Sequence, residues 1–343
     1  MSEKIYKIGN KILKIGGKLL TVSEEPPVLP PYTIRLKFSE GVTPTFNKGT
    51  AVQVISSPNI WDLTYENTDW HSLVVGKQSL LEVLGGNTSG VTVMNGMFVN
   101  CTNLKKVVLF DTSSVTNTGI MFYDCSSLTT VPMFNTSSVA YMYSMFEGCS
   151  SLTSVPLFDT SSATDMRSMF SRCSNLASVP LFDTSRVTYI QGMLENCRSL
   201  TSVPLFDTSS ATIMSGMLAG CRSLTSVPLF DTSSATNMYS MLSGCSSLTS
   251  VPLFDTRLVT DMSYMFAACS SLILVPLLDT SSATNMNRMF EGCVNVQSGA
   301  LALYQQASSQ TTPPSNHDRT FRNCGSNTVT GADELAQIPG DWK

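Results

Sequence analysis

The chain has 343 residues with a net charge of −4, and charged residues make up 13% of it, about half of the roughly 25% found in soluble proteins. Without a basic block, this balance favours neither a nucleic-acid-binding protein nor a protein attracted to an anionic membrane. No apolar run approaches the roughly 18 residues of a membrane helix, so we expect no membrane insertion.

Residues 1–22 alternate lysines with β-forming residues around two glycine-containing turns, which predicts short hairpin strands or an extended arm that needs a partner. The lysines interrupt any continuous apolar stretch and no small-residue cleavage site follows, so we expect no secretory signal. The arm is a candidate anchor, and its candidate contact residues are Ile5, Tyr6, Ile8, Ile12, Leu13 and Ile15.

A proline-rich stretch at residues 23–31 is typical of a stiff, extended linker. Residues 32–76 contain two alternating segments, at 32–38 and 51–55, which predict strands. Trp61, Tyr65 and Trp70 supply apolar mass for a cap. We therefore expect a small N-terminal β region that covers the end of the following domain.

Residues 77–298 are one 24-residue unit repeated. Such a period is the signature of a stacked repeat protein. The first unit is degenerate, with Lys77 in place of the cysteine, as expected for a terminal repeat. The cysteines that keep the spacing are Cys101, Cys125, Cys149, Cys173, Cys197, Cys221, Cys245, Cys269 and Cys293.

The unit that starts at Cys149 shows what each repeat builds. Leu152, Val155 and Leu157 fit the strand of a leucine-rich repeat, although Pro156 removes a ladder hydrogen bond and predicts very short strands. Apolar residues from 163 to 173 follow at helical spacing. We therefore predict an α/β repeat fold: a right-handed, leucine-rich-repeat-like solenoid of about ten coils, each a short parallel strand plus a short helix.

The pattern breaks at Gly299, and residues 299–343 are expected to form a helical C-terminal cap. Segments 300–307 and 330–337 have helical composition, and Thr330 is a plausible N-cap of the second.

Stacking turns each repeat position into a column. One column holds Phe134, Phe158, Phe182, Phe206, Phe230 and Phe254. By strand alternation these rings should form an exposed ridge on the concave face, suited to a sugar face or an extended peptide. The alternative is that the rings stack on one another and belong to the core.

The other columns favour structural roles. The cysteines are expected to be buried free thiols, because a single file of thiols does not supply four converging ligands to a metal. The aspartates, such as Asp159, are expected to accept backbone N–H bonds in the turn that follows, rather than to bind calcium. The variable pairs, such as Gln191-Gly192 and Tyr239-Ser240, are either a solvated face or a surface tuned to a partner.

Catalytic chemistry has little support in the sequence. The two histidines, His71 and His317, lie outside the repeats, and an enzyme would need them to converge with Cys324 in one cleft. There is no glycine-rich phosphate loop and no metal-spaced motif, so we expect no enzyme activity, no cofactor and no metal site.

The repeated phrase from Phe158 to Cys173, Phe-Asp-Thr-Ser-Ser-Ala-Thr-x-Met-x-x-Met-Phe-x-x-Cys, resembles the BspA-like leucine-rich-repeat surface protein family over about two thirds of the chain. Members of that family are non-catalytic adhesion and binding proteins. The arm at residues 4–20 and the segment 299–307 resemble virion-associated proteins of gut tailed phages, which leave the cell by lysis and need no export signal.

These resemblances imply a phage virion protein of fibre or decoration type. Its arm would dock on other virion proteins, and its rod would bind a glycan or protein on the host surface. The alternative is a bacterial cell-surface adhesin of the BspA-like type. A homo-oligomer is compatible with either, although no coiled-coil heptad enforces one.

Overall fold

The computed structural model describes residues 13–15, 18–20, 28–54 and 57–343. Of the candidate anchor residues, Ile5, Tyr6, Ile8 and Ile12 lie outside this part of the chain, as does most of the 23–31 linker. Strand β1 (Leu13–Ile15) pairs antiparallel with β2 (Lys18–Leu20), which is the kind of hairpin the sequence predicts.

A five-stranded sheet forms the N-terminal end of the described fold, in the order β4-β5-β3-β6-β7. Its strands are β3 (Thr33–Phe38), β4 (Thr50–Gln53), β5 (Ile60–Thr64), β6 (Leu80–Asn87) and β7 (Lys106–Val107). Strand β6 pairs antiparallel with β3 and parallel with β7. The sheet therefore crosses the boundary expected at residue 76 and joins the β region to the first coil.

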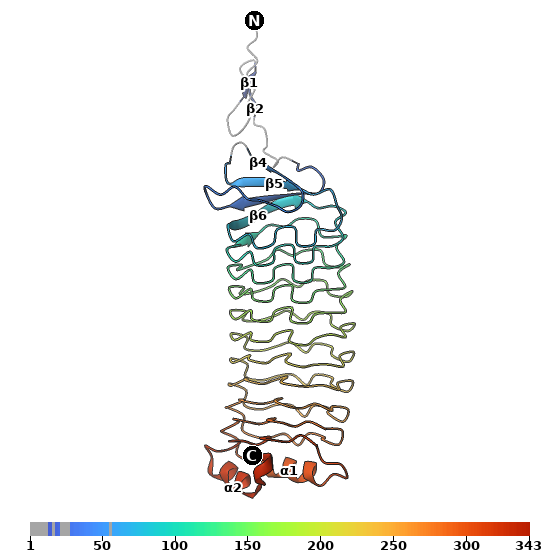
Figure 1. Cartoon of the computed structure of the whole chain (residues 1–343), viewed down its shortest axis with the longest axis vertical. Helices are drawn as coiled ribbons and strands as arrows, with labels where there is room; N and C mark the ends of the chain where they lie inside the picture. Colours follow the sequence, from blue (N-terminus) through green and yellow to red (C-terminus); the bar gives the residue numbers. More distant parts are fainter. Residues whose placement is uncertain (1–12, 16–17, 21–27, 55–56) are drawn as a thin grey trace.

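The rest of the chain is a stack of coils, seen edge-on along the long axis in Figure 1. Parallel bridges join equivalent residues of neighbouring coils, from Asp69↔Val93 to Asp261↔Asn285 at intervals of 24 residues, and the last, Asn285↔Asn316, reaches into the cap. The first coil contact at Asp69 lies ahead of the expected start of the repeats at residue 77. The predicted repeat solenoid is thus the observed architecture.

The core is a set of columns that no single coil could bury alone. In the unit from Cys149, the side chains of Leu152, Met166, Met169 and Phe170 are all fully buried, as is the thiol of Cys149. Equivalent residues lie above and below them in the neighbouring coils. The apolar side chains of each coil are therefore shielded from water only because two other coils cover them.

The predicted return helix is wrong. Between Met166 and Cys173 the chain makes successive i→i+3 turns, and alternate N–H groups bond to the next coil instead of along a helix: that of Met166 donates to the Tyr189 carbonyl at 2.9 Å. Ser168 and Arg172 have positive φ, 53° and 62°, which an α-helix does not allow. The apolar residues at helical spacing are buried, but the backbone that carries them is a series of turns and not a helix.

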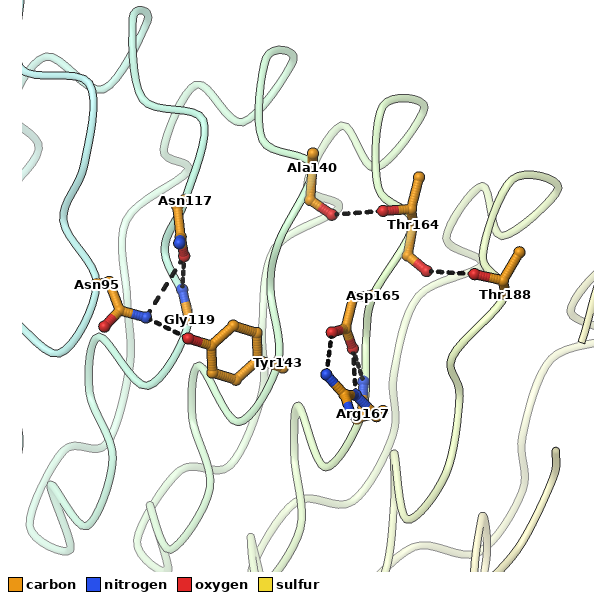
Figure 2. Close-up of polar contacts among 9 residues, drawn as sticks. All are labelled: Asn95, Asn117, Gly119, Ala140, Tyr143, Thr164, Asp165, Arg167 and Thr188. Carbon is orange, nitrogen blue, oxygen red and sulfur yellow. Dashed lines mark hydrogen bonds and ion pairs between the residues drawn. The ribbon is translucent and has the colours of Figure 1, made fainter.

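A ladder of threonines runs along one edge of the stack. The Thr164 hydroxyl donates to the Ala140 carbonyl and the Thr188 hydroxyl to the Thr164 carbonyl, both at 3.3 Å (Figure 2). Among the described residues, no hydrogen bond joins Thr212 to the Thr188 carbonyl, although the ladder resumes when Thr236 donates to the Thr212 carbonyl. The junction between these two coils therefore has fewer hydrogen bonds than its neighbours.

The C-terminal cap contains α1 (Ala300–Ser308), α2 (Val329–Gln337) and the 3-10 turn η1 (Gly340–Trp342). Both predicted helices are present, but the N-cap of α2 is Thr328, whose hydroxyl accepts from the Gly331 N–H at 3.1 Å. Between the helices, residues 316–325 add a last half-coil on which Phe321 stacks on Phe290. None of the helices in the described part of the chain has the length and apolar character to span a membrane.

Candidate functional site

The phenylalanine column is part of the core, so the predicted concave ridge is wrong at these residues. Phe134, Phe158, Phe182, Phe206, Phe230 and Phe254 are at most 3% exposed. Their rings stack along the column and against the second aromatic column, with 6.5 Å between the centroids of Phe158 and Phe182 and 5.9 Å between those of Phe146 and Phe158.

The reason is a tight turn that the alternation rule does not foresee. The Phe158 N–H donates to the Pro156 carbonyl at 3.0 Å, which closes a three-residue turn around Leu157. The same bond recurs in other coils, for example between Phe206 and Pro204. Because the turn reverses the chain, the ring points inward and the leucine at the apex points to solvent.

An exposed apolar column therefore exists, one residue before the predicted one. Its side chains are 56–64% exposed and each occupies the same position in its coil. We call it the leucine ridge: Leu109, Met133, Leu157, Leu181, Leu205, Leu229, Leu253 and Leu277. The proline that precedes most of these residues was the sequence signal that could have found it.

The aspartates beside the ridge hold its turns in place. The Asp159 carboxylate accepts the hydroxyl of Ser161 at 2.6 Å and its N–H at 3.1 Å, and these two bonds lower the pKa of Asp159. The buried Thr160 hydroxyl donates to the Asp183 carbonyl of the next coil at 2.8 Å. The predicted turn-capping role is confirmed, and it sets a row of carboxylates alongside the leucines.

Hollows lie at both ends of the ridge. One of about 430 Å³ includes Leu109 and Met133 in its lining. Another of about 670 Å³ lies between Leu253, Leu277 and Gln306 of α1. The ridge is thus bounded by concave surface where it meets the β region and the cap.

The cysteine column is confirmed as buried, free thiols. Each column thiol donates to a carbonyl of the preceding coil, as that of Cys149 does to Phe122 at 3.2 Å. Burial raises the pKa of these thiols, to about 12 at Cys245. No group of three or more histidine, cysteine, aspartate or glutamate side chains is placed to hold a metal ion in the described part of the chain.

The variable pairs lie in the turn segments, where most of their residues are at least partly exposed, although Gly192 and Ser263 are buried. Several of these positions line a hollow of about 500 Å³, which we call the turn-face hollow and which shares no residue with the ridge. It extends over successive coils from Ser168 past Gln191 and Glu195 to Tyr239. Burial raises the pKa of Glu195, Glu147 raises it further, and Arg172 opposes both.

The histidines belong to opposite ends of the chain's fold. His71 lies beside the N-terminal sheet, where its ring contacts the Ser72 hydroxyl at 3.2 Å. His317 lies in the C-terminal cap, stacked on Trp342 at 4.2 Å between centroids. The stack of coils separates these two regions (Figure 1), so the cleft that an enzyme of this kind would need is not formed.

The coil stack, with its buried columns and its exposed leucine ridge, defines a stacked repeat protein. The family model described as "Mycoplasma protein of unknown function, DUF285" matches residues 74–179, 130–227, 154–251, 174–273 and 201–304. These overlapping matches span more than half of the chain, so the chain belongs to this family. Its repeats are of the BspA-like leucine-rich-repeat type, as the sequence resemblance indicates.

Two solved structures are also similar to this chain. A leucine-rich-repeat protein of T. pallidum shares 18% identity over 60% of this chain and 90% of its own, with a TM-score of 0.33. A leucine-rich-repeat protein from Eubacterium ventriosum shares 16% identity over 78% of this chain and 80% of its own, with a TM-score of 0.38. No curated protein matches the sequence.

Proposed function

We propose that this chain is a non-enzymatic binding protein whose solenoid presents the leucine ridge to a protein or glycan on a host cell surface. The observation that carries the proposal is the exposure of an apolar side chain at the same position of eight coils. These side chains add little to the core, and a continuous exposed apolar stripe is typical of an interaction surface.

The spacing of the ridge supports an extended partner. Each coil contributes one leucine or methionine and, two residues later, one aspartate or asparagine that caps the turn. A partner that runs along the coils would therefore meet an apolar stripe flanked by a parallel row of polar side chains, with room for its ends in the two bounding hollows.

The ridge is tested by replacing its centre. We expect the triple variant Leu181→Ser, Leu205→Ser, Leu229→Ser to bind host cells at least about tenfold more weakly than the wild type, since it removes three apolar contacts. The matched control changes the same residues to methionine, which already occupies the ridge at Met133. Equal binding by the serine and methionine variants would contradict the proposal.

Where the chain is located, on a phage particle or on a bacterial cell, is a separate part of the proposal. We place the chain on a phage particle, docked through residues 1–22 with Leu13, Ile15 and the preceding apolar residues against other virion proteins. The resemblance of both termini to virion-associated proteins supports this. The repeat resemblance to surface proteins favours the alternative, a bacterial cell-surface adhesin.

Mass spectrometry of purified particles and of fractionated cell envelopes separates the two settings. We expect the chain in particles at a fixed ratio to the other virion proteins. Its presence only in envelope fractions would favour the adhesin and overturn the virion placement, without affecting the test of the ridge.

A further inference from the structure

Five successive coils, from Ser144 to Ser240, carry a small residue at one position, and the turn-face hollow lies over the last four of them. Ser168, Gly192, Gly216 and Ser240 are 24 residues apart, and all have positive φ. The two coils that follow hold large side chains at the same position, Tyr264 and Arg288, which show that the backbone accepts them there. The hollow is therefore a property of these coils and not of the repeat as such.

A comparable gap closer to the N-terminus is filled. Gly119 leaves space that the Tyr143 ring covers, since a Cβ at Gly119 would lie 2.5 Å from that ring. The Tyr143 hydroxyl accepts from the Asn95 amide at 2.7 Å, two coils away (Figure 2). Over Gly216, by contrast, a Cβ would have no neighbour closer than 4.0 Å.

Two of the hydrogen-bond acceptors that line the hollow lack strong internal partners. The Gln191 side-chain oxygen is buried and has no hydrogen-bond partner among the described residues. The Glu195 carboxylate has one long contact, 3.3 Å from the Asn196 amide, and no ion pair within the described part of the chain. A buried acceptor that lacks a donor is costly, so the Gln191 oxygen favours a ligand that brings a donor. The partly exposed Glu195 carboxylate offers a second acceptor beside it.

The remaining lining sets the character of that ligand. No lysine or arginine lines the hollow, so an anionic ligand would meet the Glu195 carboxylate without a cation in contact. Arg172, which acts on Glu195 from outside the lining, already pairs with two other carboxylates. Tyr239, 44% exposed, offers a ring face at one end, and serine hydroxyls lie between. A volume of about 500 Å³ is within the usual size of small-molecule sites.

We propose that the turn-face hollow binds an uncharged saccharide, with Gln191 and Glu195 accepting its hydroxyl groups and Tyr239 packing against one sugar ring. The saccharide can be a free oligosaccharide or the end of a glycan on a surface, because the hollow is open to solvent along the turn face. This site is independent of the leucine ridge.

The test uses the full chain on a glycan array, followed by calorimetric titration with the saccharides that bind. We expect binding to neutral saccharides and none that depends on sialic acid, sulfate or phosphate. Free and surface-linked forms of the same saccharide then show whether the ligand must be displayed. An array without neutral binders, or with binders that all require a negative charge, overturns the proposal.

Variants locate the site. Gly216→Tyr fills the hollow with a side chain that the equivalent Tyr264 shows to be accommodated, and should weaken binding at least about tenfold. Ser144→Tyr places the same side chain at the equivalent position outside the hollow and should bind as the wild type does. Unchanged affinity in a folded Gly216→Tyr variant overturns the assignment.

A second pair of variants tests the same site without relying on the Gly216→Tyr substitution. Gln191→Leu and Tyr239→Ala should each weaken saccharide binding by about threefold to tenfold, because one removes an acceptor and the other the ring face. The serine variant of the leucine ridge should bind the saccharide normally, so a failure of the ridge proposal remains distinguishable from a failure of this one.

Discussion

At the scale of single residues, the thiols tie neighbouring coils together. The Phe98 carbonyl accepts both the Cys101 N–H of its own coil, at 3.2 Å, and the Cys125 thiol of the next, at 3.1 Å. The thiol thus satisfies a buried carbonyl that water cannot reach. The period of the cysteines predicted their burial, but the acceptor could not be predicted, because it belongs to another coil.

The raised thiol pKa makes stability depend on pH in one direction. An unfolded thiol ionises near its ordinary pKa of 9.0, whereas Cys101 in the folded chain does so at about 12. The native state therefore holds its protons longer, and the free energy of unfolding should be level below about pH 8 and fall from about pH 9 to pH 12.

Urea titrations at pH 7 to 10.5 measure this effect. Each column thiol should contribute a slope of about 1.4 kcal/mol per pH unit once it ionises in the unfolded chain. Burial also raises the pKa of Cys221. In the variant Cys221→Ala the free energy of unfolding should therefore fall less steeply with pH, by about 1.4 kcal/mol per pH unit. An identical slope in wild type and variant would contradict the assignment to the thiols.

At the scale of the repeated element, the ring inside the proline turn matters more than the leucine at its apex. Phe206 is 1% exposed and Leu205 is 59% exposed. We expect Phe206→Ala to lower the free energy of unfolding by about 3–5 kcal/mol through the cavity it leaves. Phe206→Leu should cost less than about 1.5 kcal/mol, because Leu278 fills that position in another coil.

Denaturant unfolding of the two variants, with Leu205→Ala as the control, measures the difference. The control should change the free energy of unfolding by no more than about 0.5 kcal/mol, as is usual at an exposed site. A control as unstable as Phe206→Ala would mean that the leucine, and not the ring, belongs to the core.

The same element shows how far sequence reasoning reached. Period and apolar pattern predicted the stacked coils and most buried columns, because every coil repeats the same burial. The predicted side-chain directions are wrong at Leu157 and Phe158, because the hydrogen bond from the Phe158 N–H to the Pro156 carbonyl closes a turn that overrides strand alternation. The predicted helix is wrong because one position of the repeat, occupied by Asn100, Asp124 and Gly148, adopts a positive φ that these residues tolerate. That position marks a turn, although the apolar residues around it have helical spacing. The turn-face hollow depends on neighbouring coils and could not be predicted from one.

At the scale of the whole molecule, stability should be nearly a sum over junctions between coils. Deleting residues 245–268 joins Gly244 to Cys269 and keeps every column in register. We expect this variant to fold, with a smaller urea m-value because less surface is exposed on unfolding. Deleting residues 245–256 shifts the columns by half a coil and should prevent folding of the C-terminal part.

Circular dichroism during urea unfolding and limited proteolysis check both deletions. The 24-residue deletion should resist protease as the wild type does, and the 12-residue deletion should be cut in its C-terminal part. Two equally sensitive variants would show that the coils are not interchangeable units.

The interrupted threonine ladder has a mechanical consequence. A rod pulled at its two ends transmits the same force through every junction, so it parts where the fewest bonds must break together. Thr188 and Thr212 lie on either side of such a junction, in the coils whose glycines also form the floor of the turn-face hollow. We therefore expect tension to open the molecule there first, and a ligand that spans the hollow to raise the force required.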